Sequence, residues 1–153
     1  MDQKAVINEP VTIGGNDYHI TCVSMGNPHC VVFVNNVDSL DIESIGPQFE
    51  FDPLFPERVN TEFVKVLDRH TIRMRVWERG AGETLACGTG AETWACGTGA
   101  CAAAVAAVEN GFCPKDEDIT IKLKGGDLVI RYTDETVYMT GEAERIFEGT
   151  IVL

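Results

Sequence analysis

The stretch ACAAAVAAVEN, residues 100–110, followed by Gly111, decides the fold that this sequence predicts. Its alanines give it high helix propensity, and a glycine directly after the last helical residue is a common helix end. Alanine, valine and cysteine occupy almost every side of this helix, so it has no polar face to present to solvent. We therefore expect a helix that is buried on all sides.

Short strands are predicted before and after this helix. Alternating apolar and polar residues predict a hairpin over residues 11–24, with its turn at 14–17. A short helix is predicted within residues 38–49, interrupted at Gly46 and Pro47, and a loop at 51–56. The other predicted strands are residues 30–34, 62–67, 71–77, 119–123, 128–132, 137–140 and 149–153.

These elements predict an α+β fold in which a mixed, strongly curved β-sheet or barrel wraps around a central α-helix. No linker or shift in composition divides the chain, so residues 1–153 are expected to form a single domain. The net charge of −12 disfavours nucleic acid and anionic membrane surfaces as partners. No apolar run is long enough to span a bilayer and the N-terminus does not resemble a signal peptide, so a cytoplasmic location is expected.

The six cysteines show neither CxxC spacing nor the Cys/His pattern of a zinc site, so no metal is expected. In a reducing compartment they would be free thiols, most of them small core residues. They are Cys22, Cys30, Cys87, Cys96, Cys101 and Cys113.

A nine-residue repeat lies directly before the predicted helix. GETLACGTG, residues 82–90, is followed at once by AETWACGTG, residues 91–99. Glycines before a helix let successive N–H groups point into one concavity, and the helix N-terminus adds roughly half a positive charge. Such a site binds a carboxylate or phosphate, and it lowers the pKa of a thiol. The pattern is equally compatible with a glycine-rich turn that holds a structural cysteine.

Polar residues elsewhere are not specific when each is taken alone. Glu78 and Arg79 end the strand that leads into the repeat, where the arginine could bind a carboxylate and the glutamate an ammonium group. Two adjacent charges at a strand end are also what a solvated ion pair looks like. Asn27, His29 and Asn60 fall in predicted loops, where asparagine is an ordinary turn residue.

Taken together, five motifs in this order resemble diaminopimelate epimerase. They are GNPH (26–29), FPERVN (55–60), ERGAGET (78–84), ACGTGACA (95–102) and KGGDL (124–128). The resemblance is to the C-terminal half of that enzyme and covers roughly residues 24–153. It implies one of two similar halves, each a β-barrel around a central helix, which agrees with the fold expected above.

The resemblance implies an isomerase that needs neither pyridoxal phosphate nor any other cofactor. It would interconvert LL- and meso-diaminopimelate for lysine and peptidoglycan synthesis. One cysteine thiolate would remove the α-proton while a thiol from the other half donates a proton to the opposite face. The cysteine of the ACGTG motif carries over to Cys96 or to its duplicate Cys87.

The resemblance also implies the residues around the substrate. Gly97 and Thr98 would give N–H groups to the α-carboxylate. Asn27, Asn60, Glu78 and Arg79 carry over as substrate-binding positions, and His29 as a supporting residue.

The sequence departs from the family in two ways. The N-terminal half and its catalytic cysteine are absent, so we expect the chain to be inactive alone and to need that half or self-association. The duplication leaves two thiols competing for one position. Cys96 has the predicted helix directly behind it, whereas Cys87 would require Gly97 and Gly99 inside the helix, at about 0.5–1 kcal/mol each. Cys96 is therefore expected at the site, with residues 82–91 as a bulged loop.

Three other interpretations remain open. The chain could be a related isomerase, such as a proline racemase or a phenazine-pathway isomerase, although the motifs favour the diaminopimelate branch. It could be a non-catalytic domain of the same fold that at most binds an amino-acid carboxylate. A redox or metal protein is disfavoured by the cysteine spacing.

Overall fold

The computed structural model describes the backbone of residues 6–84, 93–141 and 144–149. The strands are β1 (Val6–Ile13), β2 (Asn16–Ser24), β3 (Pro28–Phe33), β4 (Asn60–Asp68), β5 (Thr71–Glu78), β6 (Gly82–Thr84), β7 (Asp118–Leu123), β8 (Gly126–Tyr132), β9 (Val137–Gly141) and β10 (Glu144–Gly149). The helices are α1 (Ile42–Glu50) and α2 (Thr93–Glu109).

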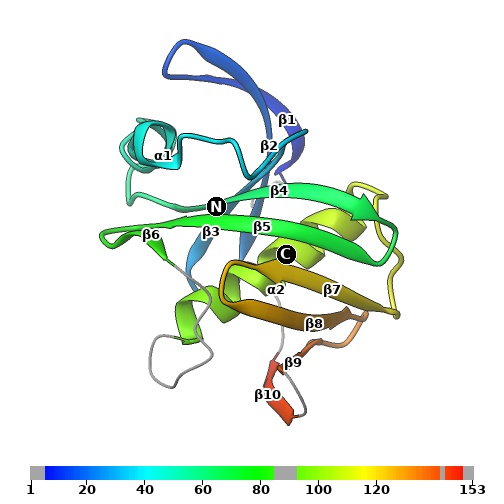
Figure 1. The fold of residues 1–153 in the computed structure, drawn as a ribbon. Coiled ribbons are helices and arrows are strands. Elements are labelled where there is room, and N and C mark those ends of the chain that lie inside the picture. Colours follow the sequence, from blue (N-terminus) through cyan, green and yellow to red (C-terminus); the bar gives the residue numbers. More distant parts are fainter. Residues whose placement is uncertain (1–5, 85–92, 142–143, 150–153) are drawn as a thin grey trace.

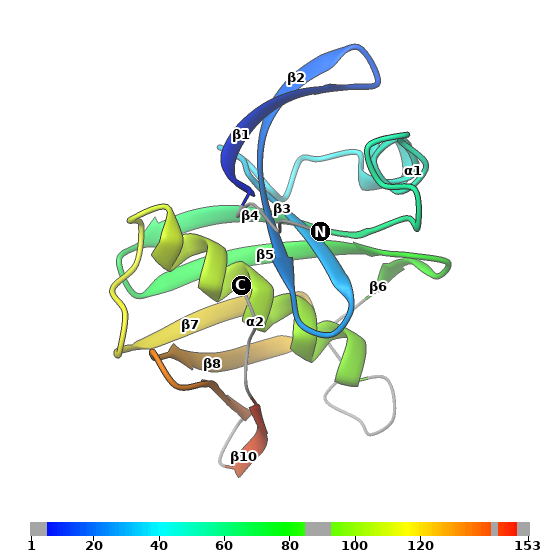
Figure 2. The same ribbon diagram turned by 180° about the vertical axis from the view of Figure 1, so that it is seen from behind.

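The strands form a single mixed sheet in the order β1-β2-β3-β4-β5-β7-β8-β9-β10, with β6 paired to β5. Neighbouring strands are antiparallel except at two places, where β3 pairs with β4 and β5 pairs with β7 in parallel. In Figure 1, β4, β5 and β7 lie in front of α2, and from the opposite side in Figure 2 α2 lies in front of them. Helix α2 contacts β2–β5 and β7–β9, so the predicted fold class of a curved sheet around a central helix is confirmed.

Two apolar clusters lie on opposite faces of the sheet. The first surrounds α2, whose residues Ala100 to Ala107 are all fully buried. The second lies between the β1–β2 hairpin and α1, with Phe49 and Phe63 at its centre. Because successive side chains of a strand point to opposite faces, β3 and β4 supply both clusters, and their middles are buried on both sides.

The predicted hairpin is confirmed, with Gly14 and Gly15 between its strands at φ angles of 58° and 83°. Two-residue hairpin turns of this kind need positive φ at both positions, which glycine adopts without steric cost. The predicted strands from residue 30 to residue 140 are also confirmed, within a few residues at their ends. Strand β10 ends at Gly149, and the rest of the strand expected at 149–153 lies outside the described residues.

The sequence predicted an interruption of this helix at Gly46 and Pro47. In the structure, helix α1 continues through both residues to Glu50. Gly46 is buried against the Trp77 indole, and a Cβ built on Gly46 would lie 2.2 Å from a ring atom. The hydrogen bond that Pro47 cannot donate would go to Glu43, an exposed residue, so its loss is tolerated. The glycine is therefore needed for helix–sheet packing and does not interrupt the helix.

No helix in the described part of the chain is both long and apolar enough to cross a membrane.

Replacing Gly46 by alanine tests this packing. Alanine normally stabilises a helix relative to glycine, but here its Cβ would overlap the buried Trp77 ring. We expect Gly46→Ala to lower the free energy of unfolding by about 1–3 kcal/mol, as overpacking does. Urea denaturation measures the change. Ser44→Ala, on the exposed side of the same helix, should change stability by less than about 0.5 kcal/mol. A Gly46→Ala protein as stable as the parent would contradict the packing described.

Candidate functional site

The sheet brings three of the sequence motifs together. In the parallel pairing of β3 with β4, His29 lies opposite Asn60. The antiparallel pairing of β4 with β5 places Thr61 opposite Trp77, so Glu78 emerges beside Asn60. The motifs GNPH, FPERVN and ERGAGET therefore meet at one end of β3, β4 and β5. We refer to Asn27, His29, Asn60, Glu62 and Glu78 as the polar cluster.

His29 and Glu62 form the buried centre of the polar cluster. His29 Nδ1 lies 2.7 Å from Glu62 Oε1, and the two residues are 2% and 0% exposed. His29 Nε2 lies 3.1 Å from Oδ1 of Asn27, which is half-buried. The loss of solvent raises the pKa of Glu62, and the adjacent imidazole opposes part of that rise. Three side chains from two strands and a loop are thus joined in one line.

Asn60 links the ends of the neighbouring strands. Its Oδ1 accepts the backbone N–H of Arg79 at 2.8 Å, and its Nδ2 donates to the carbonyl of Pro28 at 3.2 Å. Both ends of the amide are therefore bonded to backbone groups. The guanidinium of Arg79 donates to the carbonyl of Glu57 at 3.1 Å, so it lies over the FPERVN loop. Asn60 and Arg79 therefore lie together, with Asn60 holding the backbone that carries Arg79.

Glu78 is held by the short strand that follows it. The hydroxyl of Thr84 in β6 donates to Glu78 Oε1 at 2.5 Å, and both residues are half-buried. This contact joins the two ends of the ERGAGET motif, which forms the turn of the β5–β6 hairpin. It also fixes the position of a carboxylate at the edge of the polar cluster.

The turn after Glu78 is fixed by a buried glutamate, Glu50, which was not among the predicted site residues. Glu50 in α1 is 3% exposed, and it accepts the indole N–H of Trp77 at 2.8 Å and the backbone N–H of Gly80 at 2.9 Å. Arg58 Nη1 lies 3.4 Å from Glu50 Oε1, the oxygen that also accepts from Gly80. Helix α1 therefore sets the position of the turn that contains Arg79. In the sequence, Glu50 is only a charged residue near the end of a predicted helix. Its role becomes visible only when α1 is seen to pack on Trp77 of β5.

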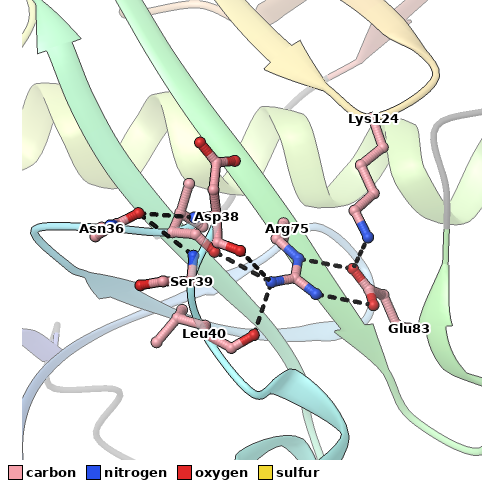
Figure 3. Close-up of polar contacts among 8 residues, drawn as sticks. Asn36, Asp38, Ser39, Leu40, Arg75, Glu83 and Lys124 are labelled. Atoms are coloured by element: carbon pink, nitrogen blue, oxygen red, sulfur yellow. Dashed lines mark hydrogen bonds and ion pairs between the residues drawn. The ribbon is translucent and has the colours of Figure 1, made fainter.

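The Arg75–Glu83 pair ties the β5–β6 hairpin to two loops, one through Arg75 and the other through Glu83 (Figure 3). Its guanidinium binds Glu83 of β6 in bidentate fashion, with Nε–Oε1 and Nη2–Oε2 distances of 2.8 and 3.1 Å. Its Nη1 donates to the Leu40 carbonyl at 2.8 Å, and Lys124, from the KGGDL motif, lies 3.2 Å from Glu83 Oε1. Hydrogen bonding from Arg75 lowers the pKa of Glu83. Strand β6 is thereby held in place on the side away from α2.

Helix α2 begins at Thr93, so the expectation that it begins near Ala100 was wrong. Gly97, Thr98 and Gly99 are helical, and their N–H groups fall within the i→i−4 hydrogen-bond pattern of the helix. They do not form the glycine-rich turn that was expected to hold a carboxylate. Instead, these glycines permit close packing, since a Cβ on Gly97 would lie 2.9 Å from Met139 Cε and one on Gly99 2.9 Å from Glu62 Oε1.

Of the two cysteines of the repeat, Cys96 lies within the described residues. Cys96 is the fourth residue of α2, in its first turn. Cys87 lies outside the described residues, as does most of the bulged loop expected at 82–91; its first residues form β6.

Three of the four other thiols, those of Cys30, Cys101 and Cys113, are ill suited to proton transfer because their pKa values are raised, whereas the hydrogen bond with Cys30 lowers the pKa of Cys22. Burial raises the pKa of Cys101 to about 12 and that of Cys113 to about 11. Cys22 and Cys30 lie opposite each other on β2 and β3. The pKa of Cys30 is raised well above its usual value, first by its hydrogen bond with Cys22 and then by burial. Among the described residues, no group of three or more His, Cys, Asp or Glu side chains is arranged to hold a metal ion.

Comparison with known proteins identifies relatives over nearly the whole chain. A sequence model of the family described as diaminopimelate epimerase matches residues 21–93 and 90–146. Diaminopimelate epimerases of Acetivibrio thermocellus and Nostoc punctiforme are 53% and 50% identical over 99% and 97% of this chain. These matches cover 51% and 50% of the two enzymes, so the chain spans about half the length of the curated relatives it matches.

Solved structures with the same fold are more distant in sequence. A phenazine biosynthesis protein of the PhzF family from Bacillus anthracis superposes with a TM-score of 0.52 and 23% identity, over 86% of this chain and 40% of that one. A PhzF-family protein from Enterococcus faecalis gives a TM-score of 0.52 and 14% identity, over 80% and 42%. At these identities the likeness concerns the fold alone.

The bidentate Arg75–Glu83 pair predicts a specific sensitivity of the site hairpin. Lysine at position 75 keeps the charge but cannot bind Glu83 through two nitrogens while also reaching the Leu40 carbonyl. We expect Arg75→Lys to lower the free energy of unfolding by about 1–3 kcal/mol. Arg73→Lys is the matched control, because Arg73 pairs with Asp38 at the surface, where such a pair contributes about 0–1 kcal/mol. Equal effects of the two substitutions in urea denaturation would contradict the anchoring role of Arg75.

Proposed function

Because the chain belongs to the diaminopimelate epimerase family, we propose that it forms one half of a cofactor-independent site that interconverts LL- and meso-diaminopimelate. The product would serve lysine and peptidoglycan synthesis in the cytoplasm. The observation that carries the proposal is the meeting of three motifs. Residues from GNPH, FPERVN and ERGAGET lie within one polar cluster that packs against α2.

The proposed reaction is an inversion at the α-carbon by two thiols. A thiolate removes the α-proton and becomes a thiol, while the electron pair of the broken C–H bond remains on the α-carbon. A thiol on the opposite face then gives its proton to that carbon and becomes a thiolate. A proton on an α-carbon is very weakly acidic, so the carbanion needs fixed donors and positive charge in a site with little water.

The polar cluster and the adjacent Arg79 supply groups of the right kinds for an amino-acid substrate. Glu78, fixed by Thr84, would accept hydrogen bonds from an ammonium group. Arg79 would bind a carboxylate, for which its planar guanidinium is well shaped. The open side of the cluster is where its two half-buried members, Asn27 and Glu78, lie. Asn27 would contact the substrate there, supported by His29. Asn60 would act by holding the backbone of Arg79, and Gly97 and Gly99 by letting α2 approach the sheet.

The first thiolate would come from the repeated ACGTG motif. Position 96 lies three residues, about one helical turn, before Gly99, which packs on Glu62 of the polar cluster. A cysteine in the first turn of a helix has its pKa lowered by the helix dipole. Cys96 is therefore the favoured base, with Cys87 as the alternative. The second thiol would be supplied by an N-terminal epimerase half or by a second copy of this chain.

Proton exchange in D₂O tests the proposed half-site. LL-diaminopimelate is incubated with the chain alone, and then with the chain mixed with a separately produced N-terminal half of a relative. We expect loss of the α-proton signal in NMR spectra, with meso product, only in the mixture. Exchange with formation of meso product by the chain alone would instead identify a self-complementing dimer. If the two halves associate and both fold but no exchange occurs, the chain is a non-catalytic domain and the proposal fails.

Single cysteine substitutions then identify the base. In whichever sample exchanges protons, we expect Cys96→Ser to slow the exchange by about 10²-fold or more, because a serine hydroxyl is a far weaker base than a thiolate. Cys87→Ser is the matched control and should leave the rate within a few-fold of the parent. Iodoacetamide labelling followed by mass spectrometry should show Cys96 reacting faster than Cys87. The reverse order of effects would transfer the role to Cys87.

A further inference from the structure

Glu62 is the most deeply buried ionisable group of the polar cluster, and the proposed reaction does not use it. It is fully buried in the middle of the sheet, and a Cβ on Gly99 of α2 would lie only 2.9 Å from its Oε1. Its Oε1 is hydrogen-bonded to His29 Nδ1, and its Oε2 has no hydrogen-bond partner among the described residues. A buried carboxylate is costly unless it is paired or holds a proton, so its presence calls for a reason.

The hydrogen-bond line Glu62–His29–Asn27 restricts where protons can be. His29 Nδ1 faces one oxygen, Glu62 Oε1 at 2.7 Å, and Nε2 faces another, Asn27 Oδ1 at 3.1 Å. Two oxygen acceptors are both satisfied only if one proton lies between Nδ1 and Oε1 and a second resides on Nε2. The Glu62–His29 pair then carries no net charge, which is the least costly state for a buried pair.

The groups around Glu62 favour this neutral state. The negative charge of Glu78 on β5 raises the pKa of Glu62. The charge of Glu62 in turn raises the pKa of the Cys30 thiol on β3. Helix α2 presents Gly99, which brings no charge and no side chain. Apart from His29, no positively charged side chain is seen to stabilise an ionised Glu62 in the described part of the cluster. Burial therefore raises the pKa of Glu62, so that the pair retains its second proton.

We infer that Glu62 is a positioning residue that acts through His29 on Asn27. By keeping a proton on His29 Nε2, it makes Asn27 accept with Oδ1, and this turns the NH₂ group of the Asn27 amide away from His29. Asn27 then offers a hydrogen-bond donor at the open side of the cluster, a choice that favours a carboxylate ligand over an ammonium group. The inference rests on the proposed function only in taking Asn27 as a contact of the substrate.

The test is ¹⁵N NMR of the histidine rings in the intact chain at pH 7 without ligand. In the parent we expect both ring nitrogens of His29 to give the shifts of proton-bearing nitrogens. In Glu62→Gln, which keeps the size but cannot share a proton, one ring nitrogen should move to the region of an unprotonated nitrogen. The backbone ¹H–¹⁵N spectrum of Glu62→Gln away from the polar cluster should match that of the parent, which a general loss of packing would not allow.

Glu117→Gln is the matched control. It removes a carboxylate from another histidine, His70, whose Nε2 lies 3.3 Å from Glu117 Oε1 at the surface. It should leave the His29 signals unchanged. An unprotonated His29 nitrogen in the parent at pH 7, or identical His29 spectra in the parent and Glu62→Gln, would overturn the inference. If Glu62→Gln does not fold, the protonation of His29 in the parent spectrum still decides between the two outcomes.

A ligand titration separates this inference from the proposed function. Adding meso-diaminopimelate to the parent should shift the Asn27 side-chain amide signals, and Glu62→Gln should bind about tenfold more weakly at pH 7, the loss expected for one charge-assisted hydrogen bond. A doubly protonated His29 with no response to the ligand would contradict the proposed substrate but leave the role of Glu62 toward His29 intact. Equal affinities of the two proteins would overturn the effect on Asn27.

Discussion

The close approach of α2 to the curved sheet is the constraint on which the rest of the structure depends. From Ala100 to Ala107 every residue of this helix is fully buried, and the helix touches the strands from β2 to β9 of the sheet order. Such burial is feasible only with side chains no larger than valine, since protein interiors are close-packed and leave no room for a bulkier helix. Gly97 and Gly99 carry the approach furthest, at a cost of about 0.5–1 kcal/mol each in helix propensity.

The same approach explains why the polar cluster lies in the interior. Gly99 of α2 packs on Glu62, and His29, Asn60 and Glu62 are buried, so these polar side chains must find partners within the protein. Asn60 does so with two backbone groups, His29 with two side-chain oxygens, and Glu50 with three donors on the other face. The pairings of Asn60 and Glu50 also hold backbone groups in place, at Pro28, Arg79 and Gly80.

The sequence predicted most of the strands and the buried helix, because alternation in residues 11–24 and the alanine run at 100–107 are local signals. It placed the start of α2 about two turns too late, since glycine before an alanine run normally marks a helix boundary. Here the glycines lie inside the helix, at positions where Met139 and Glu62 leave no space for a Cβ. Tertiary packing overrode propensity, and the same happened at Gly46 against Trp77.

The residues missed at the site were missed for a related reason. Asn27, Asn60, Glu78 and Arg79 belong to recognisable motifs, whereas Glu62 and Glu50 do not. Glu62 is a charge within an apolar strand, and its meaning depends on the parallel pairing that sets β4 beside His29. Parallel neighbours are joined by long connections, so their register leaves no mark in the local sequence.

The second copy of the duplicated motif, residues 91–99, is the copy that lies in α2, and the burial of the helix explains why. If α2 were shifted by nine residues so that the first copy took the place of the second, Glu92, Thr93 and Trp94 would move to the positions of Cys101, Ala102 and Ala103. Those three positions are fully buried and surrounded by the sheet, and none has room for an indole or tolerates an unpaired carboxylate.

Rotation leads to the same answer. Nine residues correspond to about two and a half helical turns, so a helix that included both cysteines would place them on opposite sides. Since Gly99 faces Glu62, the rotation of α2 about its axis is already fixed by the second copy. The alanine run that follows only the second copy therefore sets both the depth and the rotation of the helix, and with them the relation of position 96 to the polar cluster.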